Sequence, residues 1–180
     1  MIEKQGDDKV GLAEFRLFLV FMRQFFEYWE MFEQLDRDGD LNIDIEQFKK
    51  AAPLLKKWNV DVTDHPEETF KAIANESGKL NYDEFCAYAA AHNRDLKCDI
   101  DWTALSAKLP TSKSEDAKAE RKKLFEDMNT SGSGCLSLTE AKEGVRNVLQ
   151  CHVSEAGHVV ERAYNAAKSF NPTIKKDGDL

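Results

Sequence analysis

Four aspartates are spaced two to four residues apart in the segment from residue 36 to residue 47. They occupy positions 1, 3, 5 and 9 of a twelve-residue stretch. Carboxylate oxygens at this spacing can surround one hard divalent cation, because calcium takes six to eight oxygen ligands. Position 7 can add a backbone carbonyl. The segment therefore predicts a calcium site whose ligands are Asp36, Asp38, Asp40, Asn42, Asp44 and Gln47.

Two positions weaken this predicted site. Gln47 closes the loop with an amide, which offers one oxygen and no charge where a bidentate glutamate is usual. Leu41 occupies position 6, where the turn needs a positive φ that costs a non-glycine residue about 1–2 kcal/mol. Gly39 can absorb part of that bend. We therefore expect reduced calcium affinity, with Mg²⁺ as a competitor.

A second loop, from residue 129 to residue 140, has the complementary composition. Its frame is good, with Gly134 at position 6, Leu136 at position 8 and Glu140 at position 12. Its other oxygens are neutral, so the attraction for a divalent ion is weak. Two interpretations of this loop remain open: it binds an ion, or it only maintains the fold without metal. The candidate ligands are Asn129, Ser131, Ser133, Cys135, Ser137 and Glu140.

Each of these loops is one copy of a repeated motif that predicts the elements around it. The copies cover residues 3–14, 36–47, 74–84 and 129–140, and their position-8 residues are Val10, Ile43, Leu80 and Leu136. Helices flanking such loops form EF-hands. We expect an all-α fold with two pairs of EF-hands, several of them degenerate, whose position-8 residues meet in short β-bridges.

Two copies are predicted to support the fold without binding an ion. The loop 74–84 is one residue short, so no acid reaches its position 1. The hand near residues 3–14 has no entering helix before it. We hypothesise that a helix over residues 153–170 complements this half-hand in space.

The apolar spacing from Phe15 to Leu35 predicts one long amphipathic helix with an aromatic face. That face either packs into the core or forms a surface for a protein partner or a second copy. The chain then divides into a first EF-hand region (1–91), a linker with a short helix (92–114) and a second EF-hand region (115–180). Ser112 and Glu115 suggest a capping box that starts the next helix.

Composition and sequence motifs disfavour several classes of function. The net charge is −8, which disfavours nucleic-acid and anionic-membrane binding. The four cysteines form no CxxC pair, and the start shows no signal peptide, so an intracellular, cytoplasmic protein is expected. Position 2 is isoleucine, so no myristoylation signal is present, and no apolar run is long enough for a transmembrane segment.

The histidines lack the spacing of a metal site, and the sequence contains no catalytic motif. No enzyme is therefore predicted.

Three segments resemble the trypanosome flagellar calcium-binding proteins, the calflagins. They are Glu14 to Phe32, the loop Asp36-Arg-Asp-Gly-Asp-Leu41, and Pro53-Leu-Leu-Lys-Lys-Trp58 with Val60-Asp-Val-Thr-Asp64. A weaker similarity covers Trp102 to Phe170, which resembles the family's amino-terminal half. The halves therefore stand in swapped order, as in a circularly permuted relative or a segment of a tandem-repeat protein. The resemblance implies an EF-hand fold and a flagellar location.

These observations predict a calcium-binding sensor that changes helix exposure and engages a protein partner. The alternative is a metal-independent EF-hand scaffold or interaction protein whose degenerate loops only hold helices together.

Overall fold

The computed structural model describes residues 9–58, 60, 65–92, 109–147 and 157–169. Residues 3–8 of the half-hand 3–14, the linker segment 93–108 and the ends of the expected helix 153–170 lie outside these ranges. Within them the regular secondary structure is helical, apart from four two-residue strands. The strands pair in two antiparallel bridges, so the predicted all-α architecture with two pairs of hands is confirmed.

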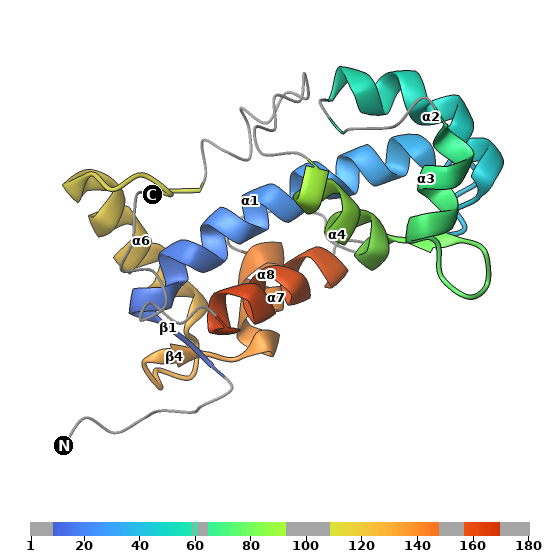
Figure 1. The fold of residues 1–180 in the computed structure, drawn as a ribbon. Helices are drawn as coiled ribbons and strands as arrows, with labels where there is room; N and C mark the ends of the chain where they lie inside the picture. Colours follow the sequence, from blue (N-terminus) through green and yellow to red (C-terminus); the bar gives the residue numbers. More distant parts are fainter. Residues whose placement is uncertain (1–8, 59, 61–64, 93–108, 148–156, 170–180) are drawn as a thin grey trace. The chain divides into compact units, whose positions relative to one another are not determined.

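The chain forms two compact units, one of residues 25–101 and one of residues 1–24 with 102–180. Helix α1 (Leu12–Leu35) runs through both units and is the longest helix in Figure 1. This division differs from the expected regions 1–91 and 115–180. The reason is that the first hand pairs with the fourth, which groups the start of α1 with the carboxyl-terminal hand.

The unit of residues 25–101 contains the second and third hands. Strand β2 (Asn42–Ile43) pairs with β3 (Leu80–Asn81), and Ile43 lies opposite Leu80. Helices α2 (Ile45–Lys57), α3 (Pro66–Ile73) and α4 (Tyr82–His92) surround this bridge. Aromatic rings fill the core, where Phe32 packs edge-on against both Tyr82 and Phe85.

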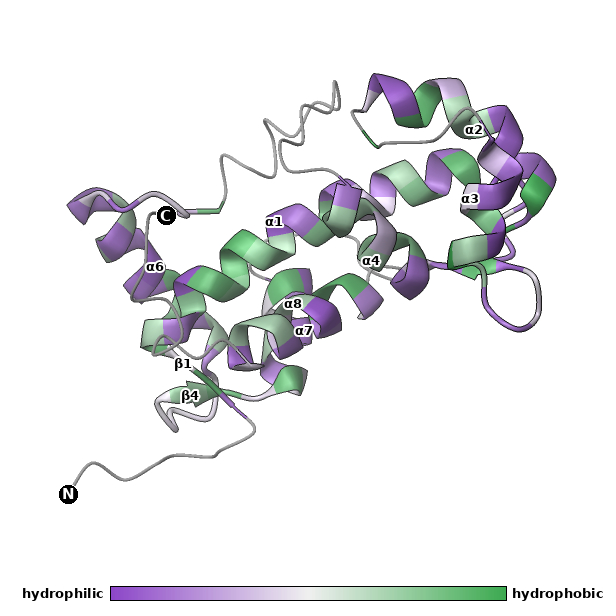
Figure 2. Cartoon of the chain, viewed as in Figure 1, coloured by the Kyte–Doolittle hydropathy of each residue, from purple (hydrophilic) through white to green (hydrophobic). Residues whose placement is uncertain are grey.

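The other unit contains the first and fourth hands. Strand β1 (Val10–Gly11) pairs with β4 (Cys135–Leu136), followed by α7 (Leu138–Asn147). Helix α6 (Glu115–Met128) is largely hydrophilic in Figure 2, but its Phe125 is buried and packs edge-on against Phe15. Helix α8 (Gly157–Ser169) contacts β1 and α7, and Tyr164 donates a hydrogen bond to the carbonyl of Leu136 at 2.8 Å.

The aromatic face of α1 is buried. Phe15, Phe18, Trp29 and Phe32 are at most 6% exposed, so in this structure the face belongs to the two cores. The capping of α6 differs from the expected box: Ser114 is the N-cap and accepts from the amide of Ala117 at 3.3 Å. Ser112 instead accepts from the amide of Ser114. No helix within the described ranges is long and apolar enough to span a bilayer.

Candidate metal centre

The backbone of the loop 36–47 follows the turn that the sequence predicts. Gly39 has φ 71° and Leu41 has φ 63°, so both lie in the left-handed region. Leu41 is the sole described non-glycine residue with a positive φ, and its side chain is 51% exposed. This conformation costs a leucine about 1–2 kcal/mol. The loop therefore keeps its shape in spite of its residue at position 6.

Three of the predicted ligands converge. Carboxylate oxygens of Asp36, Asp38 and Asp40 lie within 4.8 Å of one another, and the described residues contain no other cluster of three or more His, Cys, Asp or Glu side chains at this spacing. Asp36 is held by the backbone, since its two oxygens accept from the amides of Gly39 at 3.0 Å and Leu41 at 2.8 Å. Oxygen donors of this kind suit a hard divalent cation.

Burial and hydrogen bonding shift the pKa values of two of these carboxyl groups in opposite directions. Burial, followed by the hydrogen bond with Asp38, raises the pKa of Asp36, whose residue is 8% exposed. The amide of Gln47, followed by the contact with Asp36, lowers the pKa of Asp38. Crowded carboxylates favour a bound cation, because an opposite charge relieves their mutual repulsion.

The side chains of Asp44 and Gln47 have another role in this structure. Asp44 is the N-cap of α2 and accepts from the Gln47 amide at 2.7 Å, while the Gln47 side-chain oxygen accepts from the Asp44 amide at 2.9 Å. The Nε2 of the same Gln47 side-chain amide donates to Oδ1 of Asp38 at 2.9 Å. Gln47 therefore closes the loop with a hydrogen bond to a predicted ligand, and Asp44 anchors the helix that follows.

A residue of the neighbouring hand also reaches the cluster. The ammonium of Lys79 lies 2.6 Å from Oδ2 of Asp40, while Oδ1 of Asp40 accepts from the amide of Asn42 at 2.8 Å. Asn42 itself turns its side-chain amide toward the carbonyl of Asp40. Both carboxylate oxygens of Asp40 thus have donors within the protein.

The loop 129–140 has the same backbone form, but its polar groups satisfy one another. Gly132 and Gly134 adopt φ 65° and 77°, at the positions that Gly39 and Leu41 occupy in the other loop. Glu140 accepts from the amides of Ser131 at 3.0 Å and Ser137 at 2.9 Å. These bonds, chiefly that from Ser137, lower the pKa of Glu140 to about 2.

The remaining predicted ligands of this loop also bond internally. The Ser131 hydroxyl donates to Asn129, and the Ser133 hydroxyl donates to the carbonyl of Cys135 at 2.8 Å. A single carboxylate with several protein donors has little repulsion for a cation to relieve. This loop maintains its shape through its own hydrogen bonds.

The third hand uses an amide in place of a ligand. Asn75 donates from its side chain to Glu84 at 3.0 Å, and Glu84 also accepts from the amide of Asn81 at 2.8 Å. In the first hand, Glu14 accepts from the amide of Gly11 at 3.1 Å. The residue at position 12 of every hand therefore bonds to the backbone at position 9, which is how each exiting helix begins.

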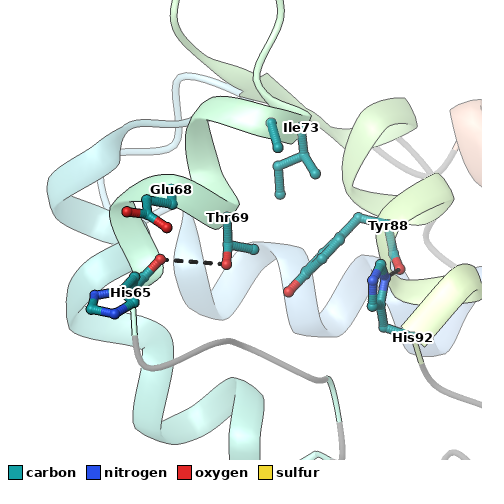
Figure 3. A pocket seen from close by; sticks show the side chains of 7 residues that line it. His65, Glu68, Thr69, Ile73, Tyr88 and His92 are labelled. Carbon is teal, nitrogen blue, oxygen red and sulfur yellow. Dashed lines mark hydrogen bonds between the residues drawn. The ribbon is translucent and has the colours of Figure 1, made fainter.

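A separate cavity of about 470 Å³ lies between α3 and α4 (Figure 3). The Thr69 hydroxyl bonds to the carbonyl of His65, and a ring nitrogen of His92 lies 2.9 Å from the carbonyl of Tyr88. The imidazole of His92 is thus bonded within its own helix at the rim of the cavity. The cavity is lined by His65, Glu68, Thr69, Ala72, Ile73, Tyr88 and His92.

The sequence of this chain matches one family model and several known proteins. The family model described as the FCaBP EF-hand domain matches residues 105–180. Flagellar calcium-binding protein TB-44A of Trypanosoma brucei brucei is 29% identical over 96% of this chain and 46% of its own length. The chain is similar to the flagellar calcium-binding proteins, and its carboxyl-terminal part matches their EF-hand domain. The resemblance seen in the sequence is thereby confirmed.

Other relatives match this calflagin-like chain over a shorter stretch. TB-24 of Trypanosoma brucei brucei is 37% identical over 53% of the chain and 44% of its own length. The flagellar calcium-binding protein of Trypanosoma cruzi is 38% identical over 54% of the chain and 46% of its own length. The chain thus spans about half the length of the curated relatives it matches. No solved structure matches it significantly.

The alignment with TB-44A also bears on the order of the two regions. It continues through 96% of the calflagin-like chain, so both regions occur in TB-44A in the order found here.

Two contacts between side chains at these loops were not predicted from the sequence, and neither was the capping box of α2. The two contacts are the ion pair between Lys79 and Asp40 and the amide bond from Asn75 to Glu84. The second could have been suspected, because an asparagine near the start of a shortened loop can replace an ion with its own NH₂ group. The capping box of Asp44 and Gln47 also had a visible signal, an aspartate followed three residues later by a glutamine.

Proposed function

We propose that this protein binds one calcium ion in the loop 36–47. The observation that carries the proposal is the convergence of three carboxylates, Asp36, Asp38 and Asp40, within 4.8 Å. The relatives are named as calcium-binding proteins, which supports calcium as the ion. The Asn42 carbonyl, Asp44 and Gln47 complete the proposed ligand set. Calcium supplies a positive charge that gathers these oxygens.

Binding changes the start of α2. The Gln47 side chain gives up its bond to Asp38 when its oxygen turns to the ion, and Asp44 is drawn from its capping position. Because α2 begins at Ile45, next to both residues, its first turn moves with them. Phe48 is fully buried in that turn against Phe70, so the movement loosens the core of the second and third hands.

The role we propose is that of a calcium sensor without catalysis. An opened core presents aromatic side chains to a protein partner or to a second copy of the chain. Magnesium competes at this loop, because Gln47 offers a single neutral oxygen where calcium gains most from a bidentate glutamate.

A metal-independent scaffold is the second candidate, and the other hands favour it. Glu140 and Glu84 have protein donors in place of an ion, so the first, third and fourth hands can maintain the fold without metal. We assign these three hands that structural role. The loop 129–140 binds an ion only where calcium displaces the bonds to Glu140.

The cellular location is also a proposal. The relatives are named as flagellar proteins, and we infer an intracellular protein associated with the flagellum. Microscopy of the tagged protein in its own cell tests this, and a uniform cytoplasmic signal would leave only the broader assignment.

The test of the calcium site is a titration followed by calorimetry and tryptophan fluorescence. Trp29 and Trp58 are both buried in the unit that contains the loop. We expect one saturable event with a fluorescence change, abolished by Asp36→Ala combined with Asp38→Ala. The matched control is Ser131→Ala with Ser133→Ala, which should bind as the wild type does. No heat and no spectral change at millimolar calcium would refute the calcium site and leave the scaffold.

A further inference from the structure

Lys79 is a positive charge that the protein itself places in the proposed ion site. Its ammonium forms a 2.6 Å ion pair with Oδ2 of Asp40. Lys79 directly precedes Leu80, and Leu80 lies opposite Ile43 in the bridge between β2 and β3. The bridge therefore fixes the distance between the backbone of Lys79 and the loop 36–47. The contact is a consequence of hand pairing.

We propose that Lys79 is an internal competitor of the cation at the loop 36–47. It neutralises Asp40 in the calcium-free protein and must leave when calcium binds. The inference rests on the proposed function of this loop and assigns the third hand a regulatory part in it.

The geometry at Asp40 supports competition over coexistence. Its Oδ1 accepts from the Asn42 amide and its Oδ2 from Lys79, so the ammonium lies beside an oxygen that faces an incoming ion. The Asn42 amide belongs to the loop backbone next to the bridge, whereas Lys79 is a flexible side chain. Two adjacent cations also repel each other. The ammonium is therefore the donor that is displaced.

Because the ion pair between Lys79 and Asp40 is exposed, Lys79 competes only weakly with the cation. The Lys79 side chain is 44% exposed and the Asp40 side chain 38%. An ion pair in such a position is weak and screened by salt. Lys79 therefore lowers calcium affinity modestly without closing the site. Its release on binding frees a charged side chain on the third hand, which couples the two hands electrostatically.

The experiment compares Lys79→Met with Lys71→Met in calcium calorimetry on the full chain. Lys71 is exposed on α3, in the same hand, and controls for the loss of one positive charge. We expect Lys79→Met to bind calcium about two- to fivefold more tightly, the range of an exposed ion pair. Lys71→Met should change affinity less than twofold. Lys79→Arg retains the charge and should match the wild type.

A double-mutant cycle with Asp40→Asn isolates the contact. In that background Lys79→Met should affect calcium binding no more than Lys71→Met does, because the partner of the ammonium is gone. The calcium-free protein gives a second readout. The side-chain carboxyl ¹³C resonance of Asp40 should shift in Lys79→Met and stay in place in Lys71→Met.

The outcomes separate the two proposals. Calcium binding by the wild type, with equal affinities for Lys79→Met and Lys71→Met, would overturn this inference alone. An Asp40 resonance that is indifferent to Lys79 would do the same. A lack of calcium binding in every variant would overturn the proposed function together with the competition that depends on it.

Discussion

The loops 36–47 and 129–140 share a backbone form and differ in how their polar atoms are satisfied. In the first, three carboxylates converge, and the balancing positive charge comes from Lys79 of another hand. In the second, one carboxylate accepts bonds from Ser131 and Ser137 of its own loop. Both loops place positions 4 and 6 in the left-handed region.

This difference shows that the shape of the turn and the demand for an ion are separate properties. Loop geometry follows from the two positive-φ residues and from the position-12 side chain that bonds to position 9. Ion demand follows from repulsion among carboxylates that a single lysine compensates only in part. Substitutions that give one loop the residues of the other therefore test each property by itself.

The largest expected effect comes from moving the charges. Asn129→Asp, Ser131→Asp and Ser133→Asp together give the loop 129–140 the acids that it lacks, while Glu140 provides the closing carboxylate. We expect one additional calcium ion per chain with a dissociation constant on the order of 10⁻⁵ M. Calorimetric stoichiometry measures this gain. An unchanged stoichiometry would mean that backbone form differs between the loops in a way that charge does not repair.

The next largest effect is on calcium affinity and comes from Gln47, the residue at position 12 of the loop 36–47. Gln47→Glu supplies a second oxygen and a negative charge, so calcium affinity should rise by about tenfold, with less competition from magnesium. Gln47→Ala removes the oxygen and should weaken binding. Competition titrations with both ions measure these changes. If the alanine and glutamate variants bind equally, the loop does not use position 12.

Glu140 should stabilise the fold without metal, in a pH-dependent way. Its folded-state pKa of about 2 lies below the ordinary 4.5, so its stabilisation is complete above pH 4.5 and disappears as the pH falls toward 2. Glu140→Gln should lower the free energy of unfolding by about 1 kcal/mol at neutral pH. The deficit should shrink through that acidic window. Urea unfolding in calcium-free buffer at several pH values measures it.

Glu143 offers the control for this prediction, because it is an exposed carboxylate on the same helix. Glu143→Gln should leave the free energy of unfolding nearly unchanged across the same pH range. A Glu140→Gln deficit that stays constant from neutral pH to pH 3 would contradict the electrostatic explanation.

The smallest effect is the strain at position 6. Leu41→Gly relieves the cost of a positive φ, which exceeds the entropy cost of glycine, so the protein should gain about 0.5–1 kcal/mol. The reciprocal change, Gly134→Ala, should destabilise the fold. Urea unfolding of the calcium-free proteins measures both. A destabilised Leu41→Gly variant would show that the half-exposed leucine side chain has a packing role.

Local features of this fold were predictable, and pairings distant in sequence were not. Position-8 residues were expected to meet in bridges, and Val10 does pair with Leu136 while Ile43 pairs with Leu80. The carboxyl-terminal helix was expected beside the first hand, and α8 does contact β1, but the pairing of β1 with β4 was not predicted, because nothing in a loop's sequence identifies its partner. For this reason the two observed units differ from the regions expected from the sequence.

The candidate site shows the same limit. The left-handed Leu41 follows from loop numbering alone and is confirmed. The ion pair from Lys79 to Asp40 joins residues 39 positions apart, so it depends on the hand pairing and was missed. The capping role of Asp44 competes with its predicted ligand role, because one short carboxylate can serve a helix start or an ion.

Amide chemical shifts during a calcium titration test the central claim most directly. The Leu41 amide donates to Asp36 at 2.8 Å and therefore reports on the carboxylate cluster, and Gly134 occupies the equivalent position in the other loop. The account predicts a large saturable shift at Leu41 at calcium concentrations that leave Gly134 unmoved. A shift at Gly134 with none at Leu41 would contradict it.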